Sequence, residues 1–467
     1  MSLAAYHELI AAKRVAFEPR GLDYVPTLNR AMKDHQTHCV DFALRAGSSA
    51  LFLDTGLGKT LCAEEWGRVI VEHTNRPVLM LAPLAVSAQH EREGAKFGID
   101  VRAIKEPDQV AEPRVYVTNY ERLAKFDALA FAGVILDESS IIKSWMGKTT
   151  RALISTFEAT PYRLACSATP APNDHAELGS HAEFLGVMAQ NQMLQRWFLH
   201  DSADTGNWRM KGHAVEDFWS WVASWARCVS LPSDLGFSDD GYVLPALDMR
   251  RHVVKADRST GDTGAERDGQ ARLFRIPDTS ATSIHKEKRL TTDARADVIA
   301  GLVADERTEP WVLWCDTDYE ADALTARIPD AIEVRGSMSP DEKEDRLIAF
   351  STGSARVIVT KPSVAGYGLN WQHCARVGFI GLSFSYESFY QAIRRCHRFG
   401  QTRPVQVHVA CADTEEAIWN VVSRKAGDHD AMKRQMTAAM KRAAGAVQRA
   451  TAYRPTLVPN LPAWVTQ

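Results

Sequence analysis

Short apolar runs alternate with longer amphipathic stretches along most of this chain. In the N-terminal half the runs lie at 51–53, 78–82, 115–118, 134–136 and 163–166. Apolar runs of this length are typical of buried strands, and the stretches between them are long enough for helices. We therefore predict a parallel β-sheet covered by helices.

A second series of the same kind follows in the C-terminal half. Its apolar runs lie at 311–315, 332–334, 356–359, 377–380 and 405–409. Helical stretches separate most of these runs. The fold class that the sequence predicts is therefore α/β, with two parallel-sheet domains.

The pattern changes between and around the two series. Residues 1 to about 48 are expected to be mainly helical, whereas Pro and Gly residues at 232–245 predict a linker. The stretch from about 256 to 283 is polar, has little periodicity and predicts a loop or insertion. We expect an N-terminal domain at 1–231, a linker and insertion at 232–284, a C-terminal domain at 285–424 and a basic helical tail at 425–467.

Two helical patterns allow more than one interpretation. The aromatic and apolar residues of 218–225 favour an amphipathic helix that buries its aromatic side, with a stacking platform for nucleic acid as the alternative. Met432, Met436 and Met440 recur every fourth residue and predict a helix that packs on the second domain. Basic residues between 433 and 442 lie beside this stripe, which leaves open a contact with a phosphate backbone.

The composition fits a globular protein. The chain has 467 residues, of which 45% are apolar, so it can bury the cores of two or three domains. It has no charge-free apolar run of about 18 residues and its start does not look like a signal peptide, so we expect a cytoplasmic protein without a membrane segment. The eight cysteines form no Cys-x-x-Cys pair, which argues against a zinc ribbon or a disulfide framework. With a formal net charge of −3, any nucleic-acid contact must come from a local groove.

The sequence LFLDTGLGKT at 51–60 is the first candidate for chemistry. An apolar run that breaks into Gly-x-Gly-Lys-Thr and resumes as a helix is typical of a loop that binds nucleotide phosphates. Gly56 and Gly58 would let backbone amides face the phosphate oxygens at the helix N-terminus. Lys59 would reach the β- and γ-phosphates, and the Thr60 hydroxyl would hold Mg²⁺. Leu53 stands where the full pattern has Gly, so a glycine turn that merely begins a helix is the alternative.

An acidic pair, Asp137 and Glu138, directly follows the apolar run at 134–136. Asp137 would hold the metal ion, directly or through water, and Glu138 would polarise the attacking water. Such a pair alone is more often a solvated turn. Together with the phosphate loop it predicts an NTP hydrolase that depends on Mg²⁺.

Further motifs occur in an order that resembles helicase superfamily two. These are Gln36, DTGLGKT at 54–60, DESS at 137–140, SATP at 167–170, GYGLN at 366–370 and QAIRRCHRFGQ at 391–401. The last motif is similar to the Swi/Snf branch, and the resemblance runs from about residue 30 to 425.

The chain departs from the Swi/Snf pattern at three places. Ser139 and Ser140 stand where that motif ends in Ala-His or Ala-Asp, Arg394 stands where the branch usually has Asp, and SFSYE at 383–387 replaces its Trp-Asn-Pro segment. The candidate ATPase residues are all present. These departures are typical of a compact, divergent member of a phage or bacterial type.

The resemblance implies two RecA-like lobes with ATP in the cleft between them. Gln36 would recognise adenine, and Ser167 and Thr169 would couple hydrolysis to lobe movement. Arg395 and Arg398 would reach the γ-phosphate from the second lobe, where a guanidinium stabilises charge on the transferring phosphoryl group. Arginines that only pair with surface acids are the alternative.

Motif chemistry and resemblance together give a set of candidate site residues. The expected catalytic residues are Lys59, Asp137, Glu138, Gln391, Arg395 and Arg398. The expected nucleotide-binding residues are Gln36, Thr55, Gly56, Gly58, Lys59, Thr60 and Gly368, and the expected Mg²⁺ ligands are Thr60 and Asp137.

The resemblance also places DNA in a groove across both lobes, against loops at 83–85, 118–120 and 360–363. Small hydroxyls, an amide and a Lys suit phosphate contacts, although each of these residues could instead form a turn. We expect a motor that uses ATP and Mg²⁺ and tracks along duplex DNA. The alternatives are a helicase that separates strands of DNA or RNA, and a nucleotide-dependent subunit that closes on a protein partner without travelling.

Overall fold

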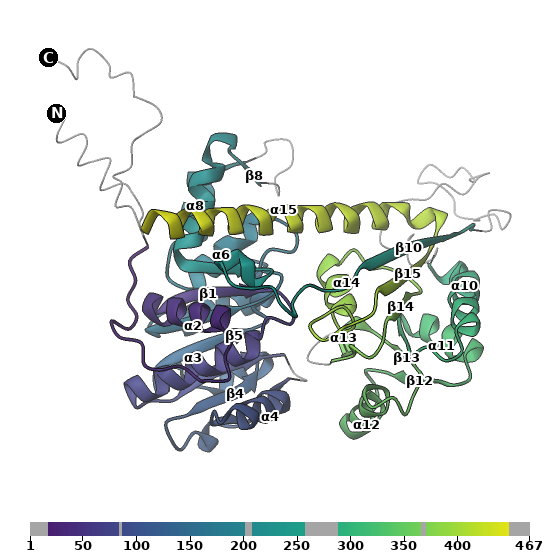
Figure 1. The fold of residues 1–467 in the computed structure, drawn as a ribbon, viewed down its shortest axis with the longest axis horizontal. Helices are drawn as coiled ribbons and strands as arrows, with labels where there is room; N and C mark the ends of the chain where they lie inside the picture. The colour runs from purple at the N-terminus through teal and green to yellow at the C-terminus, as the bar shows by residue number, and fades with distance from the viewer. Residues whose placement is uncertain (1–16, 84–85, 201–207, 257–287, 366–369, 448–467) are drawn as a thin grey trace, which may run out of the picture.

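The computed structural model describes residues 17–83, 86–200, 208–256, 288–365 and 370–447. They form two parallel sheets, each with helices on both faces, and one long helix that runs across both (Figure 1). The predicted fold class, α/β with two parallel-sheet domains, is confirmed. We call the two sheets with their helices the first and the second lobe.

The first lobe contains a seven-stranded parallel sheet with the order β3-β4-β2-β5-β6-β1-β9. Its strands are β1 (Ser48–Leu53), β2 (Val78–Ala82), β3 (Val101–Ala103), β4 (Val115–Asn119), β5 (Gly133–Asp137), β6 (Tyr162–Cys166) and β9 (Ala226–Val229). Its helices are α2 (Asp34–Ala46), α3 (Lys59–Thr74), α4 (Ser87–Phe97), α5 (Lys148–Thr156), α6 (Leu178–Phe184), α7 (Gln190–Trp197) and α8 (Val215–Trp225). A small antiparallel pair, β7 (Phe198–His200) with β8 (Trp208–Met210), extends from α7.

The second lobe contains a six-stranded parallel sheet with the order β10-β15-β14-β11-β13-β12. Its strands are β10 (Leu247–Val254), β11 (Trp311–Trp314), β12 (Ala331–Val334), β13 (Val357–Thr360), β14 (Arg376–Phe379) and β15 (Val405–Ala412). Its helices are α10 (Thr292–Asp305), α11 (Asp318–Arg327), α12 (Pro340–Ser351), α13 (Pro362–Ala365), α14 (Tyr386–Ile393) and the start of α15 (Glu416–Val447).

Strand order decides which motifs meet. β1 lies between β6 and β9, with Leu51 opposite Cys166 on one side and Arg227 on the other. β6 in turn pairs with β5, so three motif-bearing strands are adjacent. Because parallel strands present their carboxyl ends at one edge, the phosphate loop, the acidic pair and the segment at 167–170 gather there.

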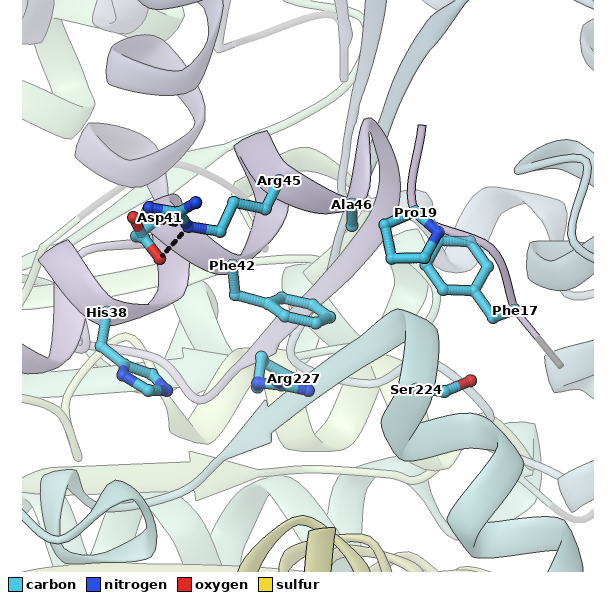
Figure 2. Close-up of a pocket in the computed structure, with 9 residues that line it drawn as sticks. All are labelled: Phe17, Pro19, His38, Asp41, Phe42, Arg45, Ala46, Ser224 and Arg227. Atoms are coloured by element: carbon cyan, nitrogen blue, oxygen red, sulfur yellow. Dashed lines mark hydrogen bonds and ion pairs between the residues drawn. The ribbon is translucent and has the colours of Figure 1, made fainter. Parts of the chain in front are cut away.

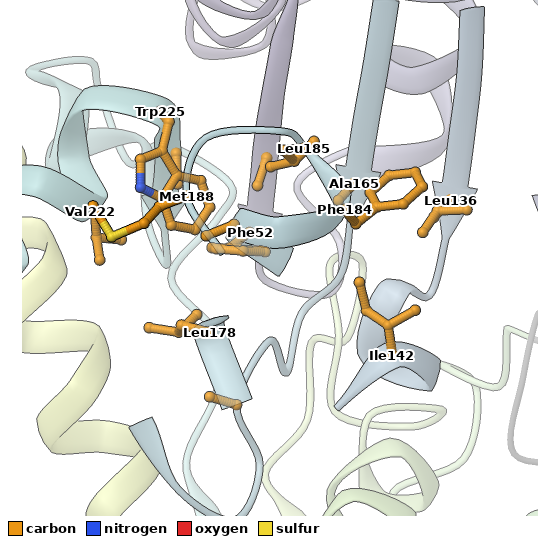
Figure 3. Packing of buried hydrophobic residues seen from close by; sticks show 14 of the residues in the cluster. Phe52, Leu136, Ile142, Ala165, Leu178, Phe184, Leu185, Met188, Val222 and Trp225 are labelled. Atoms are coloured by element: carbon orange, nitrogen blue, oxygen red, sulfur yellow. The ribbon is translucent and has the colours of Figure 1, made fainter. Parts of the chain in front are cut away.

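The first sheet is buried on both faces. Figure 3 shows part of the core on one face, where Phe52, Leu136 and Ala165 of the strands pack near Phe184 and Trp225. The opposite face packs against α2 and α3. The aromatic side of α8 belongs to this core, so the amphipathic interpretation of 218–225 is confirmed.

The methionine stripe of α15 was expected on the second domain, and that expectation is wrong. Met432, Met436 and Met440 belong to the core of the first lobe, where α15 packs against α8 and β9. The earlier part of the same helix, with Ile418 and Val422, packs on the second lobe. The helix is long enough to leave the second lobe, so its second half finds its apolar partner on the first (Figure 1).

Two other expectations need correction. Within the described part of the N-terminal stretch, residues 17–33 contain no helix and are broken by Pro19 and Pro26, and the helix α2 follows them. Residues 247–254, in the segment expected to be a linker, form the edge strand β10 of the second sheet. The polar stretch expected at 256–283 lies almost wholly outside the described residues.

Candidate active site between the lobes

The phosphate loop, residues 54–60, turns through two glycines with positive φ. Gly56 has φ +93° and Gly58 has φ +81°, a backbone conformation that side chains with a Cβ rarely adopt. A Cβ on Gly56 would lie 2.8 Å from the Cβ of Phe399, which belongs to the second lobe. A Cβ on Gly58 would lie 2.1 Å from Nε2 of Gln36. Glycine is therefore required both by the turn and by what packs on it.

Gln36 fastens the phosphate loop to the start of α2. Its Oε1 accepts a hydrogen bond from the Lys33 backbone N–H at 2.8 Å, and its Nε2 donates to the Leu57 carbonyl at 3.0 Å. The side chain is buried. Gln36 thus sits directly beneath the loop, and one N–H of its amide remains for a ligand.

Lys59 and Glu138 form an ion pair inside the site. Their Nζ and Oε1 atoms are 2.9 Å apart, and both side chains are mostly buried. Burial opposes the charge on Lys59, but the carboxylates of Glu138 and Asp137 raise its pKa. Burial raises the pKa of Glu138, and the positive charge of Lys59 opposes this rise. The backbone of Glu138 is left-handed, with φ +54°, at a cost of about 1–2 kcal/mol.

His90 of α4 contacts Asp137, the other carboxylate of the acidic pair. Its Nε2 lies 3.3 Å from Oδ2 of Asp137, and its Nδ1 lies 2.9 Å from Oε1 of Glu64 on α3. Although burial disfavours the imidazolium, these two hydrogen bonds raise the pKa of His90 to about 9. The Tyr120 hydroxyl also donates to the Asp137 carbonyl at 2.7 Å. Asp137 is therefore fixed by His90, which the sequence did not single out, and by Tyr120, which was expected to contact DNA.

The second lobe presents a loop, residues 394–400, to this site. We call it the finger loop. Phe399 covers Gly56. The charge of Arg395, like that of Lys59, opposes the rise that burial causes in the pKa of Glu138. Burial lowers the pKa of Arg398, and the negative charge of Glu93 on α4 opposes this change. Both arginines thus lie close enough to an acidic residue of the first lobe for the two charges to interact.

Some of the buried polar atoms without a hydrogen-bond partner among the described residues belong to the motifs that meet here. They include Oγ1 of Thr55, Oδ1 of Asp137, Oε2 of Glu138 and Nε2 of Gln391. Burying such atoms without a partner costs free energy, so their presence on both lobes fits a site for a polar ligand. The oxygen atoms are of the kind that Mg²⁺ prefers.

Two family models match this chain. The model described as SNF2-related domain matches residues 57–213, and the helicase conserved C-terminal domain matches residues 294–400. The chain belongs to the Swi/Snf-like branch of helicase superfamily two. Domains of the SNF2 type imply ATPase activity, with ATP as the nucleotide.

Curated relatives agree with this family. The chain is 22% identical over 434 residues to the SWI/SNF-related matrix-associated actin-dependent regulator of chromatin subfamily A-like protein 1 of Bos taurus, covering 83% of this chain and 43% of that protein. It is 25% identical over 230 residues to the SWI/SNF chromatin-remodeling complex subunit snf22 of Schizosaccharomyces pombe, covering 41% of this chain and 14% of that protein. The chain thus spans less than half the length of either relative.

A solved structure is also similar to this Swi/Snf-like chain. It is the Sulfolobus solfataricus SWI2/SNF2 ATPase core in complex with dsDNA, at 17% sequence identity and a TM-score of 0.42. The match covers 91% of this chain and 98% of that chain.

Several expected residues of the Swi/Snf-like motifs lie in or beside the site. Thr60 lies half-buried in the first turn of α3, and Gln391 accepts a long hydrogen bond of 3.5 Å from Nη2 of Arg395. Ser167 and Thr169 are fully buried, with the Thr169 backbone N–H bonded to the Ser167 hydroxyl at 3.1 Å. Gly368 lies outside the described residues.

The loops expected to touch DNA are only partly accessible. Thr118, Asn119, Tyr120 and Thr360 are buried, so the expectation that they contact phosphates is wrong for this arrangement of the lobes. The Tyr120 hydroxyl instead donates a hydrogen bond to the Asp137 carbonyl, and the Thr360 hydroxyl donates to the Val334 carbonyl. Ser363 is exposed and Lys361 is partly exposed, and Leu84 and Ala85 lie outside the described residues.

A hollow of about 200 Å³ lies elsewhere on the first lobe, between the end of α2 and Arg227 (Figure 2). The Arg227 guanidinium lies 3.4 Å from the Phe42 ring centroid and donates to the carbonyls of Ala223 and Ala226. These carbonyls lie at the end of α8, so Arg227 caps that helix. The hollow contains none of the motif residues, so the contact between the lobes remains the candidate site.

Two kinds of feature are absent from the described residues. No group of three or more His, Cys, Asp and Glu side chains there could hold a metal ion. No helix in that part of the chain is long and apolar enough to cross a membrane.

Proposed function

We propose that this chain is a motor that hydrolyses ATP with Mg²⁺ and moves along duplex DNA. The observation that carries the proposal is the seating of the finger loop on the phosphate loop, with Phe399 against Gly56 and the charge of Arg395 acting on Glu138. A nucleotide held by one lobe would thus be met by cations from the other. Hydrolysis would then depend on closure of the lobes.

The first lobe supplies the grip on ATP. Backbone amides of the turn at Gly56 and Gly58 would face the phosphate oxygens, at the N-terminus of α3. Lys59 would leave Glu138 for the β- and γ-phosphates. Gln36, already bonded to the loop, would offer its remaining N–H to the adenine.

Thr60 and Asp137 would hold Mg²⁺, directly or through water. His90 contacts Oδ2 of Asp137, whereas Oδ1 has no hydrogen-bond partner among the described residues. Oδ1 is therefore the oxygen available for this role. The ion, when bound, offsets the negative charge of the phosphate oxygens.

Glu138 would act on the attacking water. Once Lys59 moves to the phosphates, the carboxylate loses its ion pair but keeps the burial that raises its pKa. A raised pKa makes a carboxylate a better proton acceptor near neutral pH. Arg395 and Arg398 would stabilise the charge that develops on the transferring phosphoryl group.

The proposal of duplex DNA as the track rests on family membership and on relatives whose names describe chromatin regulators. The net charge of −3 requires a local contact surface rather than a basic protein as a whole. Lys361 and Ser363, at the end of β13, are accessible candidates for phosphate contacts.

The test is ATP turnover measured with duplex DNA, single-stranded DNA and RNA at one salt concentration. We expect duplex DNA to stimulate turnover most strongly. Equal stimulation by all three would contradict a duplex tracker. Turnover that no polynucleotide changes would favour a subunit that closes on a protein partner.

A further inference from the structure

Asp54, the first residue of the phosphate loop, is surrounded by donors from three parts of the chain. Its Oδ1 accepts hydrogen bonds from the Thr55 backbone N–H at 2.8 Å and from the Tyr390 hydroxyl. Its Oδ2 accepts from Nζ of Lys433 at 2.8 Å and from Nη2 of Arg394 at 3.2 Å. Thus α14, the finger loop and α15 all meet on one carboxylate of the first lobe.

The charges in this cluster do not cancel. Arg394 and Lys433 bring two cations to one carboxylate, and all three side chains are largely buried. Burial opposes ionisation of Asp54, yet the two cations hold its pKa well below the usual range. Without Asp54 the two cations would face each other at low dielectric, so this carboxylate is what allows both to stay.

The cluster fixes the loop that carries the candidate fingers. Arg394 directly precedes Arg395, and its Nη1 lies 3.4 Å from the carbonyl and from Nδ1 of His397 within the same loop. One guanidinium therefore joins Asp54 of the first lobe to the finger loop of the second. Arg394 stands where the branch usually has Asp, and an Asp at this position could not form the ion pair with Asp54.

Lys433 adds a contribution from α15. Its ammonium contacts both Asp54 and, at 3.2 Å, the Tyr390 hydroxyl. The turn that carries it is anchored on the first lobe by Met432 and Met436, which are buried in that core. The position of Lys433 therefore depends on α15 lying across both lobes.

We propose that Arg394 and Lys433 are positioning residues for the proposed ATPase reaction, because they grip Asp54 and so hold the finger loop against the phosphate loop. The inference rests on the proposed function. It predicts that the seating of α15, far along the chain from any family motif, controls how fast bound ATP is hydrolysed rather than how well it binds.

The test compares Lys433→Met with Lys441→Met in the full chain. Both changes remove an ammonium from α15, but Lys441 is exposed and its nearest acid, Asp234, is 3.9 Å away. We expect Lys433→Met to lower kcat about 10- to 100-fold while KM for ATP changes less than about threefold. Lys441→Met should match the unaltered protein in both quantities.

A conservative variant separates positioning from simple loss of structure. Lys433→Arg keeps a cation that can reach Asp54, so it should recover most of the kcat that Lys433→Met loses. The thermal unfolding midpoints of the three variants show whether each is folded. A kcat for Lys433→Met equal to that of Lys441→Met would overturn the inference, as would a loss confined to KM.

Failure of this inference is distinct from failure of the proposed function. If the unaltered protein does not hydrolyse ATP, the proposed function fails before any variant is compared. If it does hydrolyse ATP, Asp54→Asn is measured both in the unaltered chain and in the Lys433→Met variant. Should Asp54→Asn lower kcat by the same factor in both, the two residues act independently and the inference is wrong. We expect instead that Lys433→Met adds little once Asp54→Asn is present.

Discussion

Single carboxylates at the contact between the lobes each face a cation from a distant part of the chain. Asp54 faces Lys433, Glu138 faces Lys59, and Glu387 of the second lobe pairs with Lys143 of the first. Buried charges are retained only where they are paired, and removing one partner is costly. Lys59 and Glu138 both belong to the first lobe, whereas the pairs of Lys143 with Glu387 and of Arg394 with Asp54 join the two lobes. Ion pairs as well as apolar packing therefore hold the lobes together.

His429 gives a pH-dependent prediction at the residue scale. It is buried on α15 between the rings of Tyr386 and Tyr390, and burial together with Lys433 lowers its pKa to about 3. The unfolded chain has the ordinary value of about 6.5, so it binds a proton first as the pH falls. The contribution of His429 to stability is thus present above about pH 6.5 and is lost as the pH falls towards 3.

We expect His429→Phe to reduce the acid sensitivity of the fold. Neither ring nitrogen of His429 has a hydrogen-bond partner among the described residues, so Phe loses no polar contact. At about pH 5 the removed penalty is of the order of 2 kcal/mol. Unfolding midpoints measured near pH 7.5 and near pH 5 check this, and the difference between them should shrink in the variant. An unchanged difference would show that His429 is not held neutral.

At the scale of elements, α15 is the piece that joins the molecule. Its first half packs on the second lobe through Ile418 and Val422, and its second half packs on the first lobe through the methionine stripe. Methionine adapts to irregular apolar surfaces, which suits a helix that crosses from one core to another. The helix therefore braces the two lobes in addition to their direct contact.

We expect Met436→Ala to destabilise the first lobe by about 2–4 kcal/mol, because Met436 is only 2% exposed and its removal leaves a cavity. Alanine is the best helix former, so the loss reports packing rather than helix propensity. Gln435→Ala, at the adjacent exposed position, is the control. Urea unfolding checks the prediction, and equal midpoints for the two variants would place the stripe outside the core.

Much of the fold was readable from the pattern of apolar residues. The predicted strands correspond to β1, β2, β4, β5 and β6 of the first lobe and to five strands of the second. The strands that were not predicted, such as β3, β9 and β10, are short or half-exposed and carry mixed residues, as in the run LDMRRHVV of β10. Their pairing is decided by neighbouring strands rather than by local periodicity.

The site was readable only where local spacing carries the chemistry. The phosphate loop and the acidic pair follow directly from residues at fixed offsets after a strand. The roles of His90 and Lys433 depend on contacts across 47 and 379 residues, which no local pattern encodes. Arg394 was singled out only as a basic residue at a usually acidic position, and nothing in the local pattern identified Asp54 as its partner.

At the scale of the whole molecule, the two lobes and the helix α15 that joins them would each contribute to ATP hydrolysis. The first lobe would hold ATP, the second would supply Arg395 and Arg398, and α15 would keep the finger loop seated. A motor requires that hydrolysis be fast only when the lobes are closed. The arginines of the finger loop are where this requirement can be tested.

The most direct measurement is the turnover of ATP by Arg398→Ala with duplex DNA present, together with its affinity for ATP. Arg403→Ala is the matched control, because Arg403 is a partly exposed arginine that pairs with Glu309 within the second lobe. We predict that Arg398→Ala lowers kcat about 10³-fold or more, while ATP affinity changes only a few-fold. Turnover at the rate of the Arg403→Ala control would contradict the claim that ATP held by one lobe is triggered from the other.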